Sequence, residues 1–456
     1  MISKTNSFGS LEMYFQCLRK TCLRLVLGLM LLAGCSLHLH AQDAGTNETT
    51  AKSSPSNPQA AYTLPPDKLE KAIHLSRAHT VLHFGNVAWT ILVLWLLVRL
   101  RVGARIRDWA ASVAGKVWLQ GFIAAPFWLL LLALIGLPTA VISHAVGLHY
   151  GLSVQHWPSW FYDWSLASLL MIFFSAIVLS VLYALMRHSP KRWWLWFWVL
   201  TLPAEVFVIF AVPVFIDPLF DHFEPLAKQN AALVEQLERV VVRGGMEIPP
   251  SRMFVMDASA KSTGVNAYVT GFGASKRVVV WDTTLKKLPI EDILFIYGHE
   301  QGHYVLNHIA KGLAFTAALT FIFYWIAYRW LLRIVASKGN TWQISSLADW
   351  SSLGLVLLLV TVLSFVAEPI GNAFSRMIEH EADVYGQEVI HGLVPDPQQV
   401  ASKDFQILGE VWLDNPTPNK FVEWWTYNHP STRERMKFAA EYNPWVEGQE
   451  PRYFKK

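Results

Sequence analysis

The sequence predicts a mainly α-helical, polytopic membrane protein that carries a small α+β insert. Of its 456 residues, 53% are hydrophobic and only 16% are charged, which is a membrane composition. Apolar runs at about 81–98, 122–146, 164–185, 193–215, 313–330 and 353–370 are long enough to cross a hydrocarbon core of ~30 Å. As buried helices of a soluble protein they would leave almost no polar surface. We therefore expect six spans, with a polar insert at 217–310 between the fourth and the fifth.

The first 41 residues have the pattern of an export leader. Lys20 and Arg24 flank an apolar run at 25–37 that is too short for a comfortable span. Three interpretations stay open: a signal peptide cleaved after Ala41, a retained anchor that makes a seventh span, and a lipoprotein processed at Cys35. All three cysteines lie in this leader, so the rest of the chain offers no disulfide and no thiolate metal ligand. Residues 42–64 form a polar linker.

Basic residues gather in three loops, after the first, third and fifth runs. They are Arg99, Arg101, Arg105, Arg107 and Lys116, then Arg187, Lys191 and Arg192, and then Arg329, Arg333 and Lys338. The loop at 147–163 contains no Lys or Arg. The positive-inside rule places the three basic loops in the cytoplasm and the insert on the outer side. The net charge of +4 is small and predicts no nucleic-acid partner, only the lipid bilayer.

The insert ends in an H-E-x-x-H motif. His299 and His303 are four residues apart on an expected helix, so their imidazoles leave the same face and reach one Zn²⁺ at about 2.0–2.1 Å. Glu300 does not share that face as a ligand, but it reaches a metal-bound water, whose pKa zinc lowers to about 7. The pattern predicts hydrolysis of a peptide bond, with Glu300 taking the proton of the water. Gly298 and Gly302 leave room beside the motif.

Spacing alone leaves the third zinc ligand open. The class with three histidines needs a His six residues after the second one, where this chain has Ile309. In the other class, the gluzincins, a glutamate of a later helix completes the site. The candidate segment, 375–383, holds Glu379, Glu381 and Asp383, with His380 beside them.

The rest of the insert has an α+β pattern. Residues 225–243 predict an amphipathic helix that begins at Pro225 and stops at a Gly-Gly pair. Strands are expected at 252–256, 266–270 and 276–281, the last two joined as a hairpin, and Pro289 opens the catalytic helix. The edge strand of such a sheet can pair with an extended peptide and hold it at the metal.

Short motifs follow one another in a fixed order: NAYVTG at 266–271, KRVVVWDT at 276–283, HEQGH at 299–303, SRMIEHEAD at 375–383 and NHP at 428–430. HYGLS at 149–153 and DPLF at 217–220 extend the series upstream. This order resembles the integral-membrane type I CAAX prenyl endopeptidases, the a-factor-converting kind, over roughly residues 65–440.

The resemblance implies a ring of membrane helices around a large chamber and assigns roles to single residues. It makes Glu379 the third zinc ligand and Asp383 the residue that orients a ligand histidine. It also implies that Asn266 binds the substrate backbone and that His429 stabilises the oxyanion or holds the peptide. Arg435 falls on a late arginine of the family that we expect to bind substrate, in a weaker alignment.

Some polar residues lie outside the motif roles given above. Glu205 in the fourth run lines a chamber or pairs with a neighbouring helix. Glu368 and Pro369 mark a kink toward the metal site. His380 is expected to point away from the metal, and His308 to contact solvent or a loop.

We therefore expect a zinc metalloendopeptidase of an inner membrane, with one Zn²⁺ per chain and peptides or membrane proteins as substrates. CAAX-type processing is the alternative, although an outward-facing site and an exported leader depart from the eukaryotic enzymes of the family. A non-catalytic scaffold or transporter with an inherited protease fold is the rival of another class. The expected division is 1–41, 42–64, membrane helices at 65–216, insert at 217–310, membrane helices at 311–374 and the third-ligand segment at 375–456.

Overall fold

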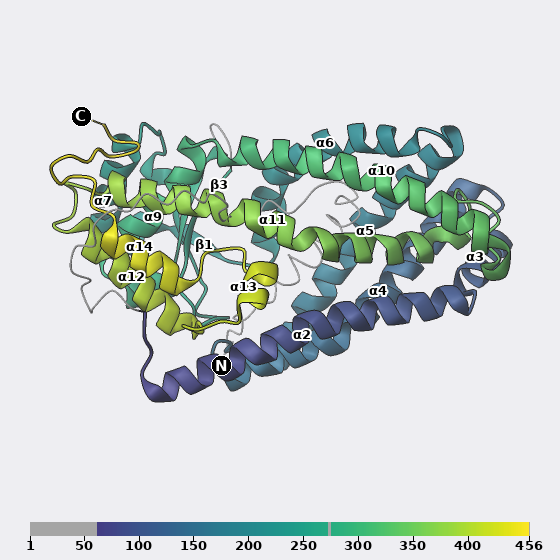
Figure 1. Ribbon diagram of the computed structural model, residues 1–456, viewed down its shortest axis with the longest axis horizontal. Helices are drawn as coiled ribbons and strands as arrows, with labels where there is room; N and C mark the ends of the chain where they lie inside the picture. Colours follow the sequence, from purple (N-terminus) through teal and green to yellow (C-terminus); the bar gives the residue numbers. More distant parts are fainter. Residues whose placement is uncertain (1–61, 272–274, 456) are drawn as a thin grey trace, which may run out of the picture.

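The structure is a computed structural model that describes residues 62–271 and 275–455 (Figure 1). The interpretations of the leader concern residues outside this range and stay predictions. In Figure 1 the insert and the C-terminal helices gather at one end of an elongated molecule, while α3 (Val102–Val113) lies at the other end. The expected basic residues lie toward the ends of α2, α5 and α10 that are remote from the insert. The prediction that Arg329, Arg333 and Lys338 lie in a loop was wrong, because α10 continues to Trp342 and contains all three.

Five described helices are long and apolar enough to cross a membrane. They are α2 (Pro66–Arg99), α4 (Val117–His149), α5 (Trp157–His188), α10 (His308–Trp342) and α11 (Leu353–Val389). The fourth apolar run forms α6 (Trp193–Ala211), then a π-helical turn (Val212–Ile216) and a 3₁₀ turn (Asp217–Leu219). Trp193–Ile209 and Val212–Leu219 are bent by 45° relative to each other, and only when they are taken together do they qualify as a sixth candidate span. Pro213 lies in the π turn, where it removes a helical N–H donor.

The insert contains a four-stranded sheet in the order β1-β2-β4-β3. The expected strands appear within one residue as β2 (Met253–Met256), β3 (Ala267–Thr270) and β4 (Arg277–Trp281). β3 and β4 pair antiparallel, as expected of a hairpin, whereas β2 and β4 are parallel. β3 is an edge strand, and β1 (Phe223–Pro225) forms the opposite edge.

The prediction of a helix from Pro225 was wrong at its start. Pro225 ends β1 and pairs with Phe254 of β2. The helix, α7, spans Ala231–Arg243, and the Asn230 side chain caps it by accepting from the Leu233 N–H at 3.0 Å. A 3₁₀ turn, Leu226–Lys228, separates strand and helix. An Asn N-cap is the stronger start signal, because its oxygen satisfies a free helical N–H.

The catalytic helix α9 (Ile290–Val305) occupies the centre of the insert, where it packs against β3, α7, α11 and α12 (Pro397–Trp412). α8 (Asp282–Lys287), α13 (Lys420–Thr426) and α14 (Thr432–Glu441) complete the described helices. The apolar side of α9, including Leu294 and Phe295, lies in the core that the sheet and α7 share. The polar end of the helix is thereby held against α11, which continues out of the bundle past Pro369.

Glycines allow α9 and α11 to cross closely. A Cβ built on Gly386 of α11 would lie 2.9 Å from the backbone nitrogen of His299 and 3.1 Å from its Cα. A Cβ on Gly298 of α9 would lie 2.6 Å from Val389, and one on Gly302 would lie 3.1 Å from Tyr385. The glycines beside the motif thus make room for α11.

We expect Gly386→Ala to weaken zinc binding and to lower the free energy of unfolding by about 1–3 kcal/mol, the usual cost of overpacking. The added methyl must push α11 away from the backbone that carries His299. Zinc titration and thermal unfolding of the purified protein measure both effects. Gly136→Ala in α4 is the control, because its Cβ meets nothing within 4 Å. Equal behaviour of the two variants would contradict the role of the crossing.

Candidate active site

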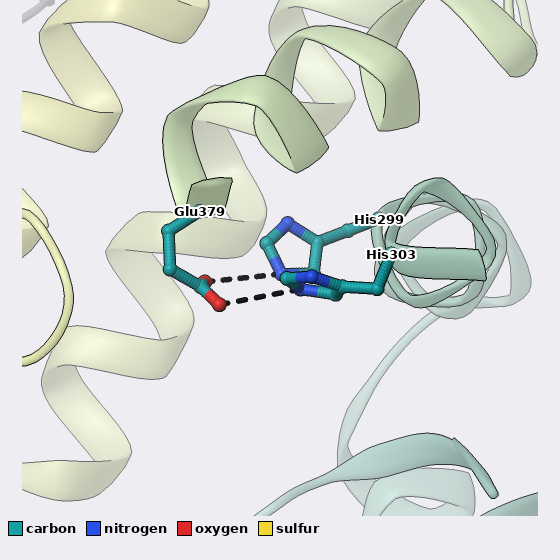
Figure 2. A group of neighbouring side chains, drawn as sticks. All are labelled: His299, His303 and Glu379. Carbon is teal, nitrogen blue, oxygen red and sulfur yellow. Dashed lines mark hydrogen bonds and ion pairs between the residues drawn. The ribbon is translucent and has the colours of Figure 1, made fainter. Parts of the chain in front are cut away.

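His299, His303 and Glu379 converge on one point (Figure 2). The two Nε2 atoms lie 3.2 Å apart. His299 Nε2 is 3.2 Å from Glu379 Oε2, and His303 Nε2 is 3.2 Å from Glu379 Oε1. All three side chains are buried. The two histidines come from α9 and the carboxylate comes from α11, 76 positions after His303 (379 − 303 = 76).

This spacing fits a tetrahedral metal. With metal–ligand distances of about 2.0–2.1 Å, two corners of a regular tetrahedron are separated by about 3.3–3.4 Å. The Nε2–Nε2 separation of 3.2 Å is close to that value. Each Nε2 atom also lies 3.2 Å from one oxygen of Glu379, His299 from Oε2 and His303 from Oε1. Two imidazoles and one carboxylate are also a donor set of catalytic zinc sites, which leave the fourth position open.

Glu300 follows the first ligand and lies half-buried beside the site. Burial raises the pKa of its carboxyl, while the neighbouring His299 and His303 lower it. A raised carboxyl pKa suits a group that takes up and returns a proton.

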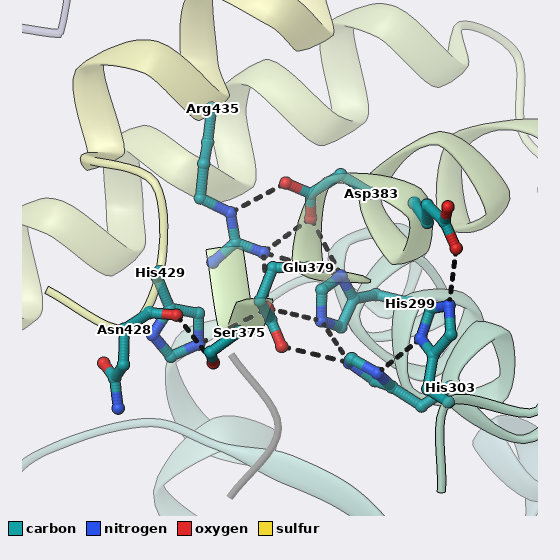
Figure 3. A network of polar contacts seen from close by, with 10 residues as sticks. His299, His303, Ser375, Glu379, Asp383, Asn428, His429 and Arg435 are labelled. Atoms are coloured by element: carbon teal, nitrogen blue, oxygen red, sulfur yellow. Dashed lines mark hydrogen bonds and ion pairs between the residues drawn. The ribbon is translucent and has the colours of Figure 1, made fainter. Parts of the chain in front are cut away.

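Asp383 and Arg435 hold the far side of the His299 ring (Figure 3). Asp383 Oδ1 lies 2.8 Å from His299 Nδ1. The Arg435 guanidinium donates to Asp383 Oδ2 at 2.9 Å and to Oδ1 at 2.6 Å. Burial lowers the pKa of His299, but the carboxylates of Glu379 and Asp383 raise it to about 10. The same negative surroundings favour a metal cation at Nε2. Arg435 therefore contacts the carboxylate that orients a ligand, and its expected contact with substrate stays a prediction.

The expectation that His308 contacts solvent or a loop was wrong. Its side chain is completely buried, and its Nδ1 lies 3.0 Å from His303 Nδ1. Its Nε2 lies 3.0 Å from Glu381 Oε2. On one continuous helix residue 308 would point elsewhere, but α9 ends at Val305 and Asn307 has a positive φ of 57°. This left-handed residue redirects the chain, so that His308 opens α10 beside His303.

His429 lies across the site from α9, on the loop between α13 and α14. Its Nε2 is 3.5 Å from Glu379 Oε2, and its side chain is 38% exposed, so it is accessible to a substrate. α11 fixes this loop: Ser375 Oγ donates to the Asn428 carbonyl at 3.0 Å. Arg376 Nη1 donates to the carbonyls of Glu423, Trp424 and Tyr427. The motif SRMIEHEAD therefore contributes the loop anchors as well as the carboxylates.

The other predicted residues lie in varied places. Asn266 directly precedes β3, and its backbone N–H donates to Thr284 Oγ1 at 2.8 Å. His380 packs its ring edge-on against Phe438, away from the metal ligands. Glu205 is buried in α6. Glu368 Oε2 lies 3.1 Å from His83 Nε2 of α2. α11 remains helical through Pro369.

Comparison with known proteins agrees with this geometry. Residues 227–443 match the model of peptidase family M48, and residues 48–222 match the CAAX prenyl protease N-terminal domain of five membrane helices. The chain is 33% identical to the metalloprotease YhfN of Bacillus subtilis over 383 residues, which cover 84% of this chain and 87% of the relative. This chain belongs to peptidase family M48. It is a multi-pass membrane metalloprotease.

The chain is also similar to two yeast proteins, one by sequence and one by structure. CAAX prenyl protease 1 of Saccharomyces cerevisiae is 28% identical over 354 residues, or 73% of each chain. The crystal structure of S. mikatae Ste24p superposes with a TM-score of 0.72 over 94% of this chain and 97% of that one, at 19% identity. At this identity the structural match supports the fold alone. It confirms the membrane bundle with a small sheet. The family models and the relatives confirm the resemblance, and the chamber stays a prediction.

Asp404 of α12 gives this M48 peptidase a pH-dependent stability. Its carboxyl is fully buried, and within the described residues neither oxygen accepts a hydrogen bond. Burial is the main cause that raises the pKa of Asp404 well above the usual range, and the nearby Asp292 raises it further. Arg435 and His299 oppose that rise. The folded state thus holds this proton more tightly than the unfolded chain. The resulting stabilisation is complete below about pH 4 and disappears as the pH rises through the raised pKa.

We expect Asp404→Asn to stabilise the protein by roughly 1–3 kcal/mol at pH 8 and by much less near pH 5, because the amide removes a buried charge. Thermal unfolding at the two pH values measures the difference. Asp396→Asn, at the exposed N-cap of the same helix, is the control for the same substitution outside the buried core. An equal effect of Asp404→Asn at both pH values would contradict the assignment.

Proposed function

We propose that this protein is a zinc metalloendopeptidase that binds one Zn²⁺ through His299, His303 and Glu379. The observation that carries the proposal is the convergence of two imidazoles and one carboxylate: the two Nε2 atoms lie 3.2 Å apart, and each lies 3.2 Å from one oxygen of Glu379. Family M48 supplies the expectation of a metal, and the donor set favours zinc.

Bound zinc would polarise the scissile carbonyl and make a water molecule acidic enough to attack it at neutral pH. The chain supplies the rest of the chemistry. Glu300 takes the proton of that water and returns it to the leaving amine. His429, opposite α9, donates a hydrogen bond to the oxygen on which negative charge develops. Asp383 and Arg435 keep the His299 ring in place.

The substrate is held as an extra strand in this proposal. β3 is the sheet edge and packs beside α9, so a peptide along it would pass the metal ligands. Asn266, at the start of β3, contacts the peptide backbone. Tyr304 Oη donates to the Gly271 carbonyl at 2.9 Å, which fixes the end of β3 relative to the motif helix.

We expect Glu300→Gln to keep normal zinc content and to lower kcat by about 10²–10⁴-fold, because the amide cannot accept the proton. Metal analysis and cleavage of a quenched peptide measure the two properties. Glu291→Gln is the matched control, because Glu291 is an exposed carboxylate in the first turn of the same helix. Normal activity of Glu300→Gln would refute its role as the base.

We further propose that the site faces the outside of an inner membrane and cleaves peptides and membrane proteins broadly. The basic residues toward the bundle end remote from the insert support this orientation (Figure 1). The relative in Saccharomyces cerevisiae, named CAAX prenyl protease 1, favours the alternative of a prenylated substrate.

Cleavage of one unstructured peptide with and without a farnesyl group on its cysteine separates the two substrates. We expect the detergent-purified protein to cut both, to lose activity with a chelator and to regain it with zinc. Cleavage of the farnesylated peptide alone would establish CAAX-type specificity and contradict the broad role.

A further inference from the structure

The two ligand histidines are held in different ways. A metal at Nε2 requires that each ring keep its proton on Nδ1 and donate it to a fixed acceptor. For His299 this acceptor is the Asp383 carboxylate at 2.8 Å. For His303 it is the Nδ1 atom of another histidine, His308, at 3.0 Å.

The direction of the hydrogen bonds from His303 through His308 to Glu381 follows from this requirement. His303 Nδ1–H donates to His308 Nδ1, so His308 accepts there and carries its proton on Nε2. His308 Nε2–H then donates to Glu381 Oε2 at 3.0 Å. Because the His308 side chain is completely buried, both ring nitrogens have protein partners in place of water.

Glu381 is itself held from two further sides. Lys311 Nζ donates to the same Oε2 at 2.8 Å, and Arg452 Nη2 lies 3.5 Å from Oε1. The backbone around Arg452 is fixed by buried Glu388, which accepts the N–H groups of Arg452 at 2.6 Å, Tyr453 at 2.7 Å and Phe454 at 3.0 Å. The Glu381 carboxylate therefore has a defined position, although its side chain is 18% exposed.

We propose that His308 and Glu381 are positioning residues that fix the tautomer and the ring orientation of His303, and that zinc affinity depends on them. The inference deepens the proposed function and rests on it. Neither residue is a ligand, so their effect reaches the metal through His303 alone. Asp383 and Arg435 serve the other ligand, His299.

The test is the zinc affinity of the detergent-purified full chain, measured by competition with a chelator of known affinity. His308→Leu and Glu381→Leu are each expected to weaken zinc binding about 10–100-fold, as loss of such partners does. Glu381→Gln keeps an acceptor for His308 and is expected to lose less. The double variant should bind zinc about as weakly as His308→Leu, because the two residues act in series.

His380→Leu is the matched control, since it is the neighbour of Glu381 but packs on Phe438. Purely structural roles would lower the unfolding temperature and leave zinc affinity unchanged, which would overturn the inference. If the double variant weakens zinc binding by the product of the two single effects, the residues do not act in series and the inference fails. Where a Leu variant is poorly stable, Glu381→Gln supplies a milder comparison. A wild-type chain that binds no zinc would instead refute the proposed function.

Discussion

The close crossing of α9 and α11 is the constraint on which the site depends. Two histidines on one helix cannot complete a metal site. The carboxylate must come from a second helix whose position along the first is fixed. Gly386 lies against the backbone of His299, and Gly298 lies against Val389, so the helices approach more closely than side chains with a Cβ would allow. This contact brings the Glu379 carboxylate to the two histidines, with each Nε2 atom 3.2 Å from one of its oxygens.

Helix α11 also joins the membrane bundle to the chemistry. Its first half lies in the core of the bundle, while its second half provides Glu379, the orienting carboxylate Asp383 and the anchors of the His429 loop. The divisions expected at 310/311 and 374/375 fall inside α10 and α11. A displacement of the bundle around α11 would therefore reach the metal ligands directly.

A buried charge needs partners, and here the carboxylates of Glu379 and Asp383 face the imidazoles and Arg435.

Much of this arrangement could be predicted from local rules. The four-residue spacing of His299 and His303 sets their common face, and the apolar runs indicate the spans. The third ligand could not be derived in this way, because three carboxylates lie within five residues of the segment. In the structure Glu379 and Asp383, four apart, share one face of α11, whereas Glu381 points to the other side and reaches His308. His308 was missed because a single left-handed residue, Asn307, breaks the helix and reverses the expected direction of the ring. β1 was missed because three residues carry no usable periodicity.

Zinc-edge X-ray absorption of the purified, full-length protein tests the central claim most directly. The account predicts one zinc per chain with a first shell of nitrogen and oxygen at about 2.0–2.1 Å, and with the outer-shell scattering of two imidazoles. Sulfur in the first shell, or the signature of fewer than two imidazoles, would contradict a site built from α9 and α11.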